Sequence, residues 1–101
     1  MISGEQREVL IKAIETYGAL HQQLKCVEEC SELAQAVTKM LVANDSEPMS
    51  LMERKELYDH IIEEVADVII MMEQMVMMLD EMEIQEVIDY KINRLAKRMG
   101  A

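Results

Sequence analysis

Apolar residues recur every three or four positions in four stretches of the chain, a spacing that places them on one face of an α-helix. The pattern predicts four helices, over about residues 4–17, 19–43, 51–80 and 84–99. Capping boxes, each a serine followed three residues later by Gln or Glu, open two of these helices at Ser3 and Ser50. Gly18 and the loop at 44–48 separate the first three helices, and the third could break near Tyr58.

The apolar stripes predict which faces are buried. The second helix is expected to bury Leu20, Leu24, Val27, Ala34, Val37 and Leu41, and the fourth to bury Ile84, Ile88, Ile92, Leu95 and Met99. At 71–78, five of the eight residues are Met and apolar residues occur all the way round the helix. A helix that is apolar on every side is buried on every side. In so small a domain, we expect the extra cover to come from another copy of the chain.

Composition supports the same fold class. Half of the residues are hydrophobic, Phe and Trp are absent, and there are only three Gly and one Pro. Such a composition suits helices better than sheets. A length of 101 residues is enough for one core. The prediction is therefore a single all-α domain over 1–101, assembled as a homo-oligomer.

Charge limits the partners. The formal net charge of −10 argues against binding to nucleic acid or to an anionic membrane. The most apolar run, 65–79, is too short to span a bilayer and contains Asp67 and Glu73. No signal peptide is visible at the start, which predicts a cytoplasmic protein. Cys26 and Cys30 are then expected to be reduced, small core residues.

Two pairs of carboxylates carry the candidate chemistry. Glu29 with Glu32, and Glu64 with Asp67, are each three residues apart and so project from one face of a helix. Glu64 falls inside the apolar stripe of the third helix, which comprises Leu57, Ile61, Val68, Met72, Met75 and Leu79. An ionised carboxylate is rarely buried unless it is paired or bound to a metal. Hard oxygen ligands on facing helices suit Mg²⁺ or Mn²⁺.

A metal cage of this kind suits reactions at phosphate, because divalent cations bridge protein carboxylates and substrate oxygens. Lys91 and Arg94 form a cationic line on the fourth helix that could hold phosphates. Gln22 and Lys25 share a helix face with the first acid pair and are candidate substrate contacts. Glu28 is the candidate catalytic residue, because it could orient or deprotonate an attacking water.

These residues resemble the motif of the MazG-like, all-α nucleoside triphosphate pyrophosphohydrolases, which include the dimeric dUTPases and the dCTP pyrophosphatases. The family motif, EExxE and then ExxD on the next long helix, reads here as EECSE at 28–32 and EVAD at 64–67. A K-x-N-R segment at 91–94 is similar to phage and bacterial members, and the likeness covers about 18–98. The 31 residues from 33 to 63 make a longer gap than the family usually has.

The resemblance implies a four-helix-bundle-type fold in a dimer or tetramer. It also implies Mg²⁺-dependent hydrolysis of a (deoxy)nucleoside triphosphate between the α and β phosphates, which gives the monophosphate and pyrophosphate. By matching position, the ligands of Mg²⁺, or of Mn²⁺, would be Glu29, Glu32, Glu64 and Asp67. Base and sugar preference stay undetermined, since any of Tyr17, Tyr58 and Tyr90 could stack on a base.

Three other interpretations remain open. Glu64 could be protonated or belong to a buried ion pair, which needs no metal. A di-iron carboxylate bundle would use Glu-x-x-His pairs, but neither His21 nor His60 has a Glu three residues before it. The chain could also be a non-catalytic helical oligomer that acts as a structural or regulatory partner.

Overall fold

A computed structural model describes residues 1–45 and 48–100 of the protein. Within these residues the secondary structure is entirely helical, which confirms the all-α class. The four helices are α1 (Gly4–Tyr17), α2 (Ala19–Asn44), α3 (Leu51–Met78) and α4 (Glu81–Arg98). The bounds agree closely with those expected from the apolar spacing, and α3 continues through Tyr58 without a break. Residues 46 and 47 of the predicted loop lie outside the described residues.

Side chains at the N-termini explain where three helices begin. The Ser3 hydroxyl accepts a hydrogen bond from the Gln6 N–H at 3.1 Å, and the Gln6 side chain accepts one from the Ser3 N–H at 2.9 Å. The predicted capping box is therefore complete. Ser50 accepts from the Glu53 N–H at 3.1 Å and caps α3.

The fourth helix begins three residues before its predicted start at position 84. Its N-cap is Asp80, whose side chain accepts a hydrogen bond from the Glu83 N–H at 3.1 Å. Aspartate is a preferred N-cap residue, because its carboxylate satisfies a free N–H of the first turn. Asp80, followed three residues later by Glu83, could therefore have indicated the start of α4 from the sequence.

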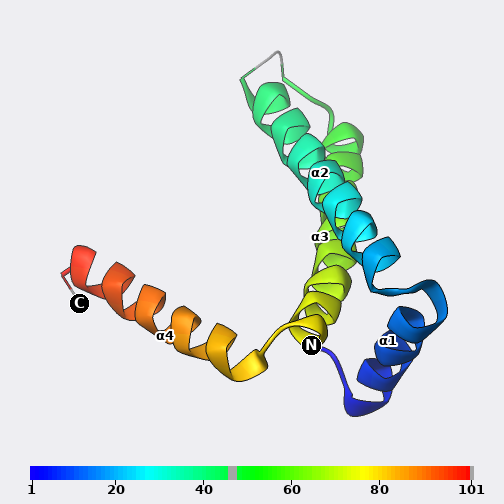
Figure 1. Cartoon of the computed structure of the whole chain (residues 1–101). Coiled ribbons are helices and arrows are strands. Elements are labelled where there is room, and N and C mark those ends of the chain that lie inside the picture. Colours follow the sequence, from blue (N-terminus) through cyan, green and yellow to red (C-terminus); the bar gives the residue numbers. More distant parts are fainter. Residues whose placement is uncertain (46–47, 101) are drawn as a thin grey trace.

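Helices α2 and α3 form a long antiparallel hairpin, and α1 packs against both of them at one end (Figure 1). After Leu79 and Asp80 the chain turns away, and α4 extends from the base of α3 as a separate arm (Figure 1). No residue of α4 is buried. None of the helices in the described part of the chain is long and apolar enough to cross a membrane.

The face that α2 presents to α3 differs from the predicted one. Gln22, Cys26, Glu29 and Ala36 are its buried residues. The stripe from Leu20 to Leu41 that was expected to be buried is instead exposed in the single chain: Leu20 is 71% exposed, Leu24 62% and Val27 68%. One helix can turn only one of two lines toward its neighbour, and here the polar and small line faces α3. Cys26 is buried as predicted, whereas Cys30 is exposed.

The apolar stripe of α4 shows the same outcome. Ile88, Ile92, Leu95 and Met99 were predicted to face inward, but they are 41–70% exposed because α4 lies apart from the hairpin. In the methionine-rich end of α3, Met71 is buried while Met72 is 41% exposed. The single chain therefore leaves uncovered the apolar stripes of α2 and α4 that its sequence marks for burial.

The dimensions lead to the same conclusion. The accessible surface is 8023 Å², against about 5,900 Å² expected for a folded monomer of this mass. The radius of gyration is 17.2 Å, against about 13 Å for a closed domain of this length. The excess surface of about 2,100 Å² is apolar to a large extent, because large hydrophobic side chains are exposed on every helix.

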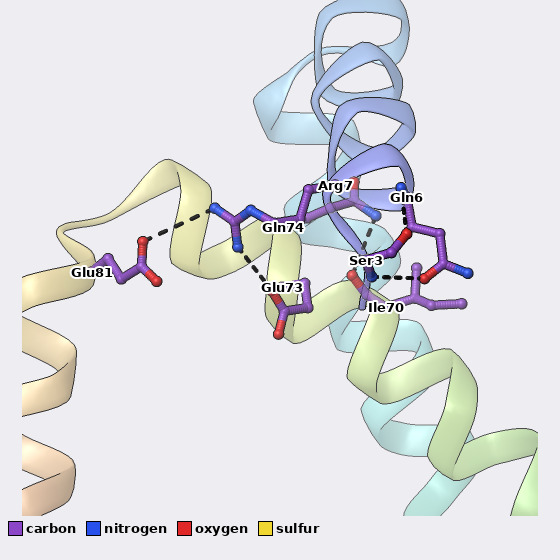
Figure 2. A network of polar contacts seen from close by, with 7 residues as sticks. All are labelled: Ser3, Gln6, Arg7, Ile70, Glu73, Gln74 and Glu81. Atoms are coloured by element: carbon purple, nitrogen blue, oxygen red, sulfur yellow. Dashed lines mark hydrogen bonds and ion pairs between the residues drawn. The ribbon is translucent and has the colours of Figure 1, made fainter. Parts of the chain in front are cut away.

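One ion-pair cluster joins the helix ends where α4 departs. Figure 2 shows Arg7 of α1 between Glu73 of α3 and Glu81 of α4. The guanidinium lies 3.3 Å from the Glu73 carboxylate and 4.0 Å from that of Glu81. All three side chains are partly exposed, so each pair contributes at most about 1 kcal/mol. The direction of α4 is therefore weakly fixed within the single chain.

Candidate metal centre

Three of the four predicted ligands converge at the middle of the α2–α3 hairpin. Glu29 of α2 and Glu64 and Asp67 of α3 each offer one carboxylate oxygen, and these three atoms lie within 4.8 Å of one another. The antiparallel pairing of the helices sets Glu29 opposite the Glu64–Asp67 turn. The i, i+3 spacing then places both α3 carboxylates on the side that faces α2.

Burial makes this cluster unusual. Glu29 is 8% exposed and Glu64 is 7% exposed, while Asp67 is half-buried. The second oxygen of each glutamate, Oε2, is fully buried, and no hydrogen bond to it is found within residues 1–45 and 48–100. An unsatisfied buried carboxylate oxygen is costly, because it has lost its hydration without replacement.

One lysine and one histidine lie beside the cluster and compensate its charge only in part. The Lys25 ammonium lies 3.4 Å from Glu29 Oε1, and His60 Nδ1 lies 3.9 Å from Glu64 Oε1. Both contacts involve the Oε1 atoms, so neither contact satisfies the buried Oε2 atoms of Glu29 and Glu64. Three carboxylate oxygens at this separation fit a divalent cation that prefers oxygen ligands. The residues present therefore fit a metal of the Mg²⁺ or Mn²⁺ class.

The fourth predicted ligand, Glu32, lies at the edge of this group. The negative charge of Glu29 raises the pKa of the Glu32 carboxyl above its ordinary value, and desolvation and the charge of Glu64 add to the effect. Glu32 is thus close enough to feel both buried acids, although it is not one of the three convergent ligands. It lines a cavity together with Glu64.

The other α2 candidates have different surroundings. Lys25, a predicted substrate contact, forms an i, i+4 ion pair with Glu29. The pKa of Lys25 is raised, first by the charge of exposed Glu28 and then by the hydrogen bond to Glu29. The Gln22 amide is buried and donates to Gln74 Oε1 at 2.7 Å, while its oxygen lies 2.8 Å from His21 Nδ1. Gln22 is therefore bound up within the protein and is not presented to a substrate.

Lys91 and Arg94 are not brought to the acids within one chain. Both lie on α4, which points away from the hairpin (Figure 1). The Arg94 guanidinium stands 5.6 Å from the centre of the Tyr90 ring on its own helix. The predicted phosphate contacts therefore cannot serve the carboxylate cluster of the same chain in this arrangement.

A groove beside the cluster brings in two residues that the sequence interpretation did not assign to the substrate. The cavity has a volume of about 830 Å³, and its lining includes Glu32, Glu64, Lys39 and His60. Lys39 lies seven residues after Glu32 on α2, and His60 lies four before Glu64 on α3. Both positions share a helix face with a candidate ligand. This spacing could have identified them from the sequence as residues near the site.

Comparison of the chain with protein-family models, curated proteins and solved structures gave no match. The acidic cluster and the groove beside it are therefore the basis for any assignment of function.

Proposed function

We propose that the protein is a Mg²⁺-dependent nucleoside triphosphate pyrophosphohydrolase of the MazG-like type. Glu29, Glu64 and Asp67 would hold the metal, with Glu32 as a further ligand from the edge of the cluster. The observation that carries the proposal is the pair of buried, unpartnered Oε2 atoms of Glu29 and Glu64. A divalent cation among the three convergent carboxylates would supply the positive charge that these atoms lack.

In the proposed reaction a water attacks the α phosphorus of a (deoxy)nucleoside triphosphate. The α–β anhydride bond breaks, and the products are the monophosphate and pyrophosphate. A metal held by these carboxylates would supply Lewis-acid activation of that water and of the phosphate oxygens. Glu28, exposed next to the cluster, would accept the proton that the water loses. The neighbouring Lys25 ammonium interacts favourably with the negative charge of Glu28.

A second copy of the chain completes the proposed enzyme. The excess surface of about 2,100 Å² per chain agrees with the area that each partner contributes to an obligate interface, where totals run from about 2,000 to 5,000 Å². The exposed stripes of α2 and α4 would pack in this interface. An α4 arm received by a second copy would also allow its Lys91 and Arg94 to approach the carboxylates of that copy.

The test is direct. The purified protein is incubated with Mg²⁺ and each common (deoxy)nucleoside triphosphate, and monophosphate and pyrophosphate are measured. We expect release of both products in equal amounts, and its loss in Glu64→Gln. Glu63→Gln is the matched control, because it removes the same charge from an exposed neighbouring position. Lack of turnover with every nucleotide would refute the proposal.

The alternative is a non-catalytic helical oligomer. The broad exposed apolar stripe of α2 favours it, because that surface requires a partner whether or not the protein is an enzyme. In that case Glu29 and Glu64 would be structural residues, stabilised by their contacts with Lys25 and His60 and not by a metal. Absence of turnover together with a melting temperature that does not respond to Mg²⁺ would favour this second function.

A further inference from the structure

The groove next to the carboxylates has acidic side chains at one end and Lys39 at the other. Glu32 and Glu64 lie in its lining at the end toward the metal centre, whereas Lys39 and His60 lie farther along α2 and α3. Its volume of about 830 Å³ is in the range of small-molecule sites. Its walls are therefore negative at the cluster, and the Lys39 ammonium adds a positive charge about two helical turns away.

Lys39 is a cation without a protein partner. No ion pair to its ammonium is found in the part of the chain that the structure describes, unlike Lys25 and Lys55, which pair with Glu29 and Asp59. Lys39 and His60 also line a second cavity of about 490 Å³ that continues the groove. The two side chains thus stand at the boundary between the cavities.

Beyond this boundary the charge changes sign. The second cavity is lined by Glu53 and Glu56, together with apolar residues such as Leu57. A polyanion that runs from the metal centre would meet Lys39 and His60 first and repulsion from the two glutamates next. The positive zone is therefore limited to one end of the first cavity.

We propose that Lys39, with His60 beside it, binds the pyrophosphate end of the substrate in the same chain that holds the metal. This inference rests on the proposed function, and it adds the direction in which the triphosphate lies. The α phosphate would lie at the metal held by Glu29, Glu64 and Asp67, and the β and γ phosphates would extend along the groove toward Lys39. The Lys39 ammonium then stabilises the charge that develops on the departing pyrophosphate.

The test uses inorganic pyrophosphate as the probe. Its affinity in saturating Mg²⁺ is measured by isothermal titration calorimetry for the intact protein and for Lys39→Gln. Loss of one charge-assisted contact is expected to weaken binding about tenfold or more. Lys12→Gln is the matched control, because Lys12 is an exposed lysine on α1, away from the groove. Its affinity should stay within about twofold of wild type. Binding of Mn²⁺ in the absence of pyrophosphate is also measured for each protein, to show whether the metal centre is intact.

The outcomes separate the two proposals. An affinity of Lys39→Gln equal to that of Lys12→Gln would overturn the inference. So would a loss of binding that occurs only in a Lys91→Gln/Arg94→Gln double variant. A wild-type protein that binds Mn²⁺ but not pyrophosphate would overturn this inference and leave the metal centre intact. A wild-type protein that binds no divalent cation would refute the proposed function itself.

Discussion

Replacing Glu64 with glutamine should stabilise the metal-free protein and abolish its stabilisation by Mg²⁺. Glu64 is 7% exposed and shares a cluster with Glu29 and Asp67 in which one oxygen of each residue lies within 4.8 Å of the others. Two unit charges at that separation repel by about 0.9 kcal/mol in water and about 3.5 kcal/mol at an effective dielectric constant of 20. The substitution removes two such repulsions.

Two other effects change this gain in stability. The substitution lowers it because His60, 3.9 Å from Glu64, then faces an uncharged amide. It raises it because the new amide can donate a hydrogen bond to a neighbouring carboxylate. A net gain of about 1 kcal/mol would raise the melting temperature by about 4–8 °C in a domain of this size. In wild type, Mg²⁺ at 100 times its dissociation constant adds about 2.7 kcal/mol. Glu64→Gln should lack this gain.

The assay is a thermal melt followed by circular dichroism, with EDTA and with a Mg²⁺ series. Glu63→Gln is the control for the change in net charge, and it should respond to Mg²⁺ as wild type does. A Glu64→Gln protein that is less stable than wild type in EDTA would contradict the reasoning. That result would make Glu64 a structural ion-pair partner of His60.

Three further predictions concern other parts of the molecule. Leu24→Glu, on the exposed stripe of α2, should shift the protein to a monomer in sedimentation velocity, and an unchanged assembly would contradict the proposed interface. Gln74→Leu should lower the free energy of unfolding in urea by about 1–3 kcal/mol, because the buried Gln22 amide nitrogen loses its acceptor. The Gln22→Leu/Gln74→Leu double variant should recover most of this loss, and strict additivity of the two substitutions would argue against the pair. Burial, with a smaller contribution from Cys30, raises the pKa of the Cys26 thiol, so less of this thiol is ionised than of an exposed cysteine. Iodoacetamide at pH 8 should therefore modify exposed Cys30 before Cys26. Equal rates of modification at the two cysteines would contradict this.

Local features of the fold were predictable because their causes are local. The caps at Ser3 and Ser50 set two helix starts from within a few residues. The start of α4 was predicted three residues late because the Asp80 cap was not recognised. The convergence of Glu29, Glu64 and Asp67 was predicted from a charged residue at an apolar position, from the two i, i+3 acid pairs, and from their resemblance to a family motif.

The arrangement of the helices was less accessible. Hydrophobicity marks the Leu20–Leu41 stripe for burial, but it does not distinguish cover by the same chain from cover by another copy. The contact of α2 with α3 instead uses the line of Gln22, Cys26, Glu29 and Ala36. The position of Lys91 relative to the acids depends on the turn at Leu79 and Asp80, and the ion pairs of Arg7 across that turn are weak because they are partly exposed.

The central claim is that Glu29, Glu64 and Asp67 together bind one divalent cation, and diffraction from crystals grown with Mn²⁺ tests it directly. The claim predicts an anomalous difference peak between α2 and α3, within coordination distance of all three carboxylates, that is absent from crystals of Glu64→Gln. A wild-type map without manganese at this place, in which Lys25 and His60 alone contact the buried acids, would contradict it.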